Sequence, residues 1–264
     1  MTAPQSVFGA MNRSLGRYPD TEILFDDTFE SGFRGWQELH TDPSVSTSGP
    51  TFAPLGLSHP SVPGPALSLV TRSKADPGIH SQSIAMKRLS HREITAGIID
   101  FEVWFAYGGE SQTGFSPRYL HFMIDEMKGG TRHFWKNRWR LVNEADTSAL
   151  AKNWYLSSQG EDIYVDTTLT TDFPWNGNKG SESYYKMSVN LSTLKYGVCQ
   201  ANSQTLDFGA VSGVTPPAAN GSGTFDDPLF NNGLNFMVGV LNRGAQDYMG
   251  WMACTRMRAT LRSA

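Results

Sequence analysis

The 264-residue chain predicts an all-β protein, an antiparallel β-sandwich of the jelly-roll type. Short segments rich in β-branched and aromatic residues recur along it, and Gly, Pro, Asn and Asp bound them. Within these segments apolar and polar residues alternate, which is typical of antiparallel sheets that bury one face. Helical signals are confined to one turn, so helices contribute little to the predicted fold.

The elements follow one another as a single domain over residues 21–264, preceded by an N-terminal arm over residues 1–20. A Pro/Ser/Gly-rich stretch over 41–65 and a second long loop, Gly209–Gly233, interrupt the strands. The one predicted helical turn is Asp146–Lys152, where an Asp or a Thr can cap the first turn. The predicted strands are Ile23–Phe29, Ala66–Thr71, His80–Arg88, Ile98–Tyr107, Tyr119–Glu126, His133–Val142, Trp154–Gln159, Tyr184–Asn190, Lys195–Gln200, Gln204–Phe208, Asn235–Leu241 and Tyr248–Leu261.

The net charge and the distribution of apolar residues in the sequence argue against nucleic acids and membranes as partners of this protein. The formal net charge of −3 lacks the positive excess of a nucleic-acid-binding protein, and no apolar run is long enough to span a membrane. The first twenty residues hold no apolar run of signal-peptide length. We therefore expect a soluble, cytoplasmic protein with reduced thiols at Cys199 and Cys254. The oligomeric state is left open, a homo-oligomer included.

One predicted strand, Ile98–Tyr107, carries two acids on its polar face. Asp100 and Glu102 are two residues apart, which separates their Cα atoms by roughly 6.5–7 Å. Enzymes that cleave glycosidic bonds use two carboxyl groups roughly 5–9.5 Å apart. Trp104 continues the same row, and an indole is a good platform for a sugar ring. The pattern predicts a catalytic pair in which Glu102 and Asp100 divide the acid and base roles.

The next predicted strand, Tyr119–Glu126, presents Tyr119, His121 and Asp125 on its polar face. If the two strands are neighbours, His121 and Asp125 join the two acids as a proton shuttle or as metal ligands. Tyr119 is then placed to contact the substrate. The alternative is a solvated sheet face on which the histidine is simply hydrogen-bonded.

Cations and a loop tryptophan complete the candidate site. In the segment Arg132–Arg140 the tryptophans alternate with basic residues, so we expect Arg138 on the polar face. There Arg138 and Lys186 orient a ligand's carboxylate or hydroxyl groups, or they balance the charge of the acids. Trp175 lies at the tip of a predicted loop, where it either walls a cleft or packs under its own loop.

Several segments carry a resemblance to a known superfamily. They are Leu24–Gly32 followed by Trp36, Ser81–Met86, Gly97–Glu102, Tyr185–Leu191 with Lys195–Val198, and Trp251–Leu261. Their order, over about residues 22 to 262, resembles the concanavalin A-like lectin/glucanase (laminin G-like) jelly rolls. The opening segment also resembles sandwiches that hydrolyse 3-keto-disaccharides. An E-x-D-x-x-E strand like that of the glucanases is absent from the sequence.

The resemblance implies a saccharide or glycoside ligand bound on the concave face of a jelly roll. It also implies a structural calcium ion near Asp26 and Asp27, as in some sandwiches of this type. The first functional hypothesis is a carbohydrate-active enzyme, a glycoside hydrolase or lyase that cleaves by hydrolysis or by elimination. The alternative is a non-catalytic, lectin-like carbohydrate-binding protein.

Overall fold

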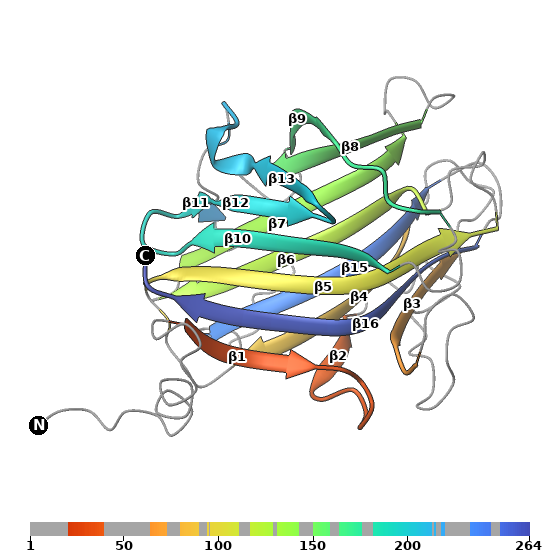
Figure 1. Cartoon of the computed structure of the whole chain (residues 1–264), viewed down its shortest axis with the longest axis horizontal. Helices are drawn as coiled ribbons and strands as arrows, with labels where there is room; N and C mark the ends of the chain where they lie inside the picture. The colour runs from red at the N-terminus through yellow and green to blue at the C-terminus, as the bar shows by residue number, and fades with distance from the viewer. Residues whose placement is uncertain are drawn as a thin grey trace, which may run out of the picture.

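The computed structural model shows two antiparallel β-sheets packed face to face (Figure 1). Their strands are short segments of alternating burial, as the sequence pattern predicts. The structure describes residues 21–39, 64–72, 80–89, 94, 96–110, 117–128, 131–142, 150–158, 164–175, 182–212, 214, 218–219, 233–243 and 249–264.

Sheet A has eight strands. They are β1 (Thr21–Asp27), β3 (Leu67–Arg72), β5 (Ile98–Gly109), β10 (Ser183–Asn190), β11 (Lys195–Tyr196), β12 (Val198–Ala201), β13 (Gln204–Asp207) and β16 (Met249–Arg262). The order across the sheet is β1-β16-β5-β10-β12-β13, with β3 paired to β16 and β11 to β10. A single turn of 3-10 helix, η1 (Phe208–Ala210), follows β13.

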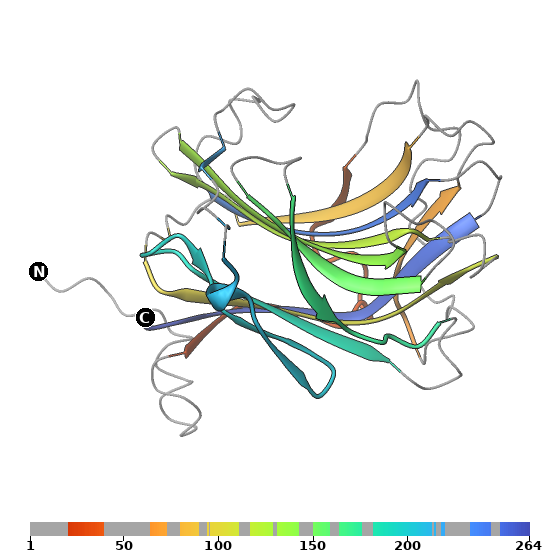
Figure 2. The ribbon, with the colours of Figure 1, turned by 90° about the horizontal axis from the view of Figure 1, so that it is seen from above.

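Sheet B also has eight strands. They are β2 (Trp36–Leu39), β4 (His80–Leu89), β6 (Tyr119–Lys128), β7 (Thr131–Val142), β8 (Leu150–Ser157), β9 (Tyr164–Thr170), β14 (Ala218–Ala219) and β15 (Gly233–Arg243). The order is β2-β4-β15-β6-β7-β8-β9, with β14 paired to β7. Seen from above, the two sheets curve in the same sense, so the outer face of sheet B is concave (Figure 2).

The core lies between the sheets and is built from the apolar row of each strand. Phe101 and Phe105 of β5 face β15 and β6, with ring centroids 5.2 Å from Phe236 and 5.5 Å from Phe122. All four side chains are fully buried, and burial of each contributes about 1.5–3 kcal/mol relative to exposure. The predicted division of each strand into a core face and an outer face is confirmed.

The pairing of strands differs from the simplest reading of the sequence. Strand β5 pairs with β16 and β10, whereas β6, the next strand along the chain, pairs with β15 and β7 in the other sheet. The expectation that Ile98–Tyr107 and Tyr119–Glu126 are neighbours is therefore wrong. The physical reason is that alternation tells which side chains are buried, but strand partners are chosen by contacts distant in sequence.

Further elements depart from prediction, among them the unpredicted short strands β2 and β14. Strand β9 was not predicted, because its sequence is rich in polar Thr and Asp and only Thr167 is buried in it. Residues 150–152 open strand β8 instead of ending a helical turn, while the rest of Asp146–Lys152 lies outside the described residues. The predicted arm over 1–20 lies outside them as well.

Both cysteines are free and fully buried. Burial raises the pKa of the Cys199 thiol to about 12, so it stays protonated and unreactive at neutral pH. Among the residues that the structure describes, no helix has the length and apolar character to cross a membrane.

Candidate functional site

The predicted site residues divide between the two outer faces of the sandwich, with the core between them. One set lies on sheet A: Asp100, Glu102, Trp104 and Lys186. The other lies on sheet B: Tyr119, His121, Asp125 and Arg138. A single site that joins Glu102 and Asp100 to His121 and Asp125 is therefore contradicted by the topology. The cause is the crossing of the chain from one sheet to the other between β5 and β6.

On sheet A the two acids are engaged by arginines of the neighbouring strand β16. Arg262 Nε donates to Asp100 Oδ2 at 2.9 Å, and Arg258 Nε lies 3.5 Å from Glu102 Oε2. The Tyr184 hydroxyl donates to Glu102 Oε1 at 2.8 Å. These contacts match the charge-balancing alternative, although β16 supplies the cations in place of Arg132–Arg140.

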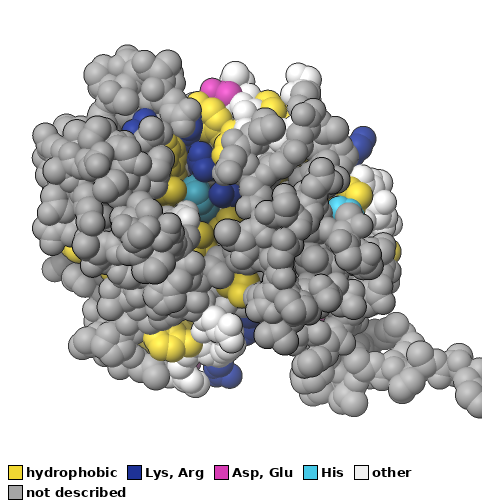
Figure 3. Space-filling view, turned by 180° about the vertical axis from the view of Figure 1, so that it is seen from behind, with side chains coloured by type: hydrophobic (Ala, Val, Ile, Leu, Met, Phe, Trp, Pro, Cys, Tyr) yellow, Lys and Arg dark blue, Asp and Glu magenta, His cyan; other side chains and the backbone are white. Residues whose placement is uncertain are grey.

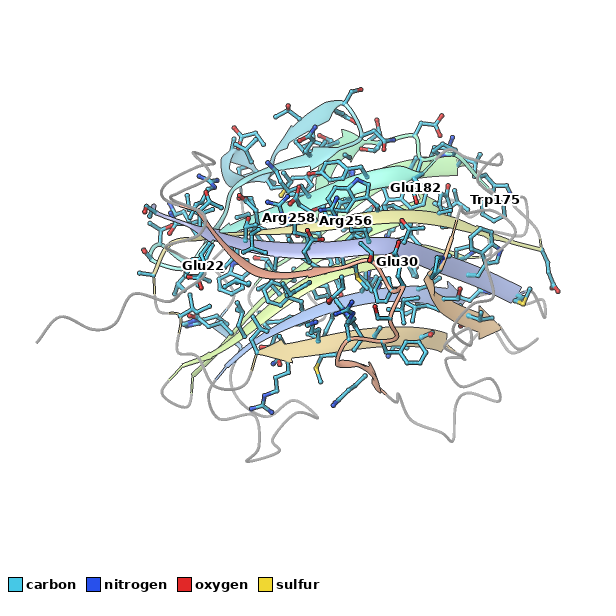
Figure 4. The ribbon with its side chains drawn as sticks, turned by 60° about the horizontal axis from the view of Figure 1, so that its bottom comes forward. Glu22, Glu30, Trp175, Glu182, Arg256 and Arg258 are labelled. Atoms are coloured by element: carbon cyan, nitrogen blue, oxygen red, sulfur yellow. The ribbon has the colours of Figure 1, made fainter. Side chains whose placement is uncertain are left out.

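The aromatic residue of this face is part of the same network. Trp104 is half-buried, and its ring centroid lies 5.0 Å from that of Tyr184. The Arg256 guanidinium lies 4.9 Å from the ring centroid of Trp104. Arg256 and Arg258 project from β16 on this face, whereas Trp175 lies toward one end of the sandwich (Figure 4). Trp175 packs edge-on against Tyr107 at 5.6 Å, which favours the reading that it is tucked against the core.

Glu102→Gln is accordingly expected to leave saccharide binding and any turnover unchanged. The amide still accepts the Tyr184 hydrogen bond, and the lost ion pair is partly exposed and worth at most about 1 kcal/mol. Thermal unfolding and a binding titration of the variant beside the unmodified protein check this. If the Glu102→Gln variant remains folded but no longer binds saccharide, the binding site lies on sheet A.

The outer face of sheet B is concave (Figure 2), and basic and hydrophobic side chains are visible together near its centre, which we call the hollow (Figure 3). One cross-strand row runs through it, from Tyr155 on β8 through Arg138, His121 and Gly239 to Ile84 on β4. Gly239 leaves the centre of this row without a side chain. A Cβ atom there would lie 3.1 Å from Ile84 Cγ1 and 3.6 Å from His121 Cβ.

His121 is buried on this face of sheet B, with 1% of its surface exposed. Its Nε2 accepts a hydrogen bond from Arg138 Nε at 3.1 Å. Burial lowers the pKa of His121 well below its ordinary value of 6.5, and the positive charges of Lys136, Arg138 and Arg140 lower it further. The imidazole is therefore neutral at ordinary pH, and because Nε2 accepts, Nδ1 carries the proton.

This depressed pKa predicts a pH dependence of stability. The unfolded imidazole takes up a proton as the pH falls through 6.5, while the folded one does not, so the unfolded state binds more protons. Stability should then fall below pH 6.5, by up to about 1.4 kcal/mol per pH unit. When urea unfolding is measured between about pH 7 and pH 5, the free energy of unfolding of His121→Gln should depend less steeply on pH than that of the unmodified protein. Parallel dependences for the two proteins would contradict the neutral assignment.

Cations and tyrosine rings alternate beside His121. The Arg138 guanidinium lies 3.8 Å from the ring centroid of Tyr164 and 4.9 Å from that of Tyr119. Arg140 lies 4.1 Å from the ring of Tyr155. The sequence pattern indicated Tyr119 and Arg138, but Tyr164 was missed because its strand, β9, was not predicted.

The hollow also has an apolar part and two separated acids. The apolar side chains form a cluster of their own on this face: Ile84, Met86, Met123, Phe134 and Met237.

Two acids of this face lie far apart. Asp125 is buried, and Asp166 is exposed and accepts hydrogen bonds from Asn153 at 3.1 and 3.2 Å. Three strand steps separate the two acids, about 14 Å or more. That distance exceeds the roughly 5–9.5 Å of a glycosidase pair.

The two aspartates considered for calcium point to opposite sides of β1. Asp26 is exposed and forms two hydrogen bonds with Arg256, at 2.6 and 2.8 Å. Asp27 is buried and accepts from Trp36 Nε1 at 2.9 Å and Lys87 Nζ at 2.6 Å. As placed, the pair does not form one ligand set. In the described part of the chain no group of three His, Cys, Asp or Glu residues could hold a metal ion.

Several solved structures superpose on most of this chain. A glycoside hydrolase family 16 endo-glucanase from Bacteroides ovatus superposes with a TM-score of 0.50 at 10% identity, over 90% of this chain and 100% of that chain. Peanut lectin gives 0.49 at 10% identity, over 91% and 97%. An endo-1,3-beta-glucanase from Streptomyces sioyaensis gives 0.47 at 12% identity, over 100% of both chains.

These likenesses, at such low identity, concern the fold. The chain is an antiparallel β-sandwich of the jelly-roll type, as its sequence predicts, and it shares the fold of the family 16 endo-glucanase. No protein-family model matches the chain, and no curated protein matches it.

Proposed function

We propose that this concanavalin A-like jelly roll is a carbohydrate-active protein that binds a saccharide in the hollow on the outer face of sheet B. The observation that carries the proposal is the row in which tyrosine rings, basic side chains and a neutral histidine meet beside a glycine. Aromatic rings stack on the apolar faces of sugars, and arginine, imidazole and phenol groups are donors and acceptors for sugar hydroxyls.

The convex face of sheet A supports saccharide binding less well. Its acids and arginines already pair with one another, so a ligand would have to displace those contacts. In the hollow, by contrast, Arg138 donates to a neutral imidazole and a phenol, and among the described residues no carboxylate pairs with it.

A screen of polysaccharides by affinity electrophoresis tests the proposal, with one variant on each face. Tyr164→Ala should weaken binding by about fivefold or more, since an aromatic contact contributes about 1 kcal/mol. Trp104→Ala is the matched control, because it removes an equally half-buried aromatic residue from sheet A. A loss of binding in Trp104→Ala alone would contradict the proposal, and so would a protein that binds none of the saccharides.

A second candidate function is cleavage of the bound saccharide. Neutral His121 and the phenols of Tyr119 and Tyr164 favour it, because imidazole and phenol groups transfer protons in catalysis. The wide separation of Asp125 and Asp166 favours elimination over hydrolysis by a carboxyl pair. The appearance of new reducing ends during incubation distinguishes an enzyme from a lectin-like protein.

A further inference from the structure

Arg138 is held in the hollow by two hydrogen bonds, one from Nε and one from Nη2 of its guanidinium. Nε donates to His121 Nε2 at 3.1 Å, and Nη2 donates to the Tyr164 hydroxyl at 2.8 Å. A guanidinium carries five N–H donors. These two contacts therefore leave three donors, two on Nη1 and one on Nη2.

The plane of this guanidinium is also fixed by stacking. Its central carbon lies 3.8 Å from the ring centroid of Tyr164 on β9, two strands away, and 4.9 Å from that of Tyr119 on the neighbouring strand β6. Hydrogen bonds and ring contacts together reduce the rotamer freedom that the side chain would lose on binding a ligand. Arg138 is half-buried and already set in one orientation before a ligand arrives.

The charge of Arg138 is not balanced by an acid within the part of the chain that the structure describes. The three arginines of β16 show the contrast, because each forms an ion pair: Arg256 with Asp26, Arg258 with Glu102 and Arg262 with Asp100. The contacts of Arg138 are instead a neutral imidazole, a phenol and two rings.

The neighbours of Arg138 add to the positive potential. Lys136 and Arg140 lie on the same face of β7, since both alternate with the buried Trp139 and Asn137. His121 contributes no charge while it is neutral, but it remains a hydrogen-bond acceptor for Arg138. The row therefore combines an oriented, doubly anchored arginine with further basic side chains on its own strand.

We propose that the saccharide bound here is acidic, and that Arg138 receives a uronate carboxylate on its remaining Nη1 and Nη2 donors. This inference rests on the proposed saccharide site in sheet B. A planar carboxylate matches the two parallel N–H donors of a guanidinium edge, which makes such pairs bidentate and charge-assisted. His121 is a positioning residue in this arrangement, because it holds Nε and so turns the opposite edge toward the ligand.

The test is a calorimetric titration of the unmodified protein with three probes: polyuronates, their methyl esters and a sulfated polysaccharide. Polygalacturonate, polyglucuronate and alginate cover the common uronate linkages. Esterification removes the carboxylate charge, so we expect it to weaken binding by at least about tenfold, the effect of losing a charged hydrogen bond. Because only the ligand is changed, the folding of a variant does not enter the comparison.

Variants of Arg138 and His121 then test whether these side chains cause the preference for the charged polyuronate. Arg138→Gln should weaken polyuronate binding at least about tenfold and weaken binding of the methyl ester by a smaller factor. Arg138→Lys should recover part of the affinity, because an ammonium keeps the charge but lacks the fork. His121→Leu should weaken polyuronate binding, and His121→Gln should restore it, because an amide oxygen again accepts from Arg138 Nε. Arg256→Gln on sheet A is the matched control.

Equal binding of the acid and methyl-ester forms, or binding of a neutral glycan in their place, would overturn the inference and leave the saccharide site standing. Binding of the sulfated probe alone would overturn it too, because the recognised anion would then not be a carboxylate. Failure of every saccharide to bind would instead remove the proposed function itself.

Discussion

Phe236→Ala is expected to lower the free energy of unfolding by about 3–5 kcal/mol. Phe236 belongs to β15 of sheet B and is fully buried. Its ring centroid lies 5.2 Å from that of Phe101 and 5.0 Å from that of Phe25, both on sheet A. Truncation therefore leaves a cavity at the point where the two sheets meet.

The measurement is the midpoint of urea unfolding, with the slope of the transition checked for change. Val198→Ala is a suitable control, since Val198 is 51% exposed on β12 and its loss should cost no more than about 0.5 kcal/mol. If Phe236→Ala is no more harmful than this control, Phe236 does not join the sheets as described.

Gly239→Leu is expected to weaken saccharide binding by about 5-fold to 150-fold. The added side chain covers the backbone beside His121 on the outer face, where even a Cβ atom lies 3.1 Å from Ile84 Cγ1. A ligand that lies over this row must shift to avoid the added side chain; a cost of about 1–3 kcal/mol, like that of overpacking, converts to that loss of affinity.

Gly239→Ala serves as the control for this site, because its single methyl group requires its neighbours to move only a few tenths of an ångström. Binding titrations of both variants, together with circular dichroism to confirm folding, give the comparison. A folded Gly239→Leu variant with unchanged affinity would show that the ligand does not use the hollow at this row.

The fold could be predicted from local pattern to a large extent. Alternation in Ile98–Tyr107 assigns Phe101 and Phe105 to the core and Asp100 and Glu102 to an outer face, and the structure agrees. Burial of alternate residues is a local consequence of strand geometry. The same pattern is strong in β6 and β15, which explains why these strands were also found.

The site could be predicted only in part. His121 and Arg138 were expected on one polar face, and they are hydrogen-bonded there. Placing Asp100 beside them required the strand order, which depends on contacts between residues far apart in the chain. The binding partner of Asp100, Arg262, lies 162 residues away in sequence. Tyr164 was missed because a polar strand at the edge of a sheet has little apolar alternation.

The central claim, that the ligand occupies the hollow of sheet B, is tested most directly by oxidative footprinting with the tightest-binding saccharide of the screen. Tyr164 on sheet B and Trp104 on sheet A are both half-buried aromatic side chains, and hydroxyl radicals oxidise both residue types. We expect saturating saccharide to protect Tyr164 from oxidation and to leave Trp104 unchanged. Protection of Trp104 with no change at Tyr164 would contradict the account.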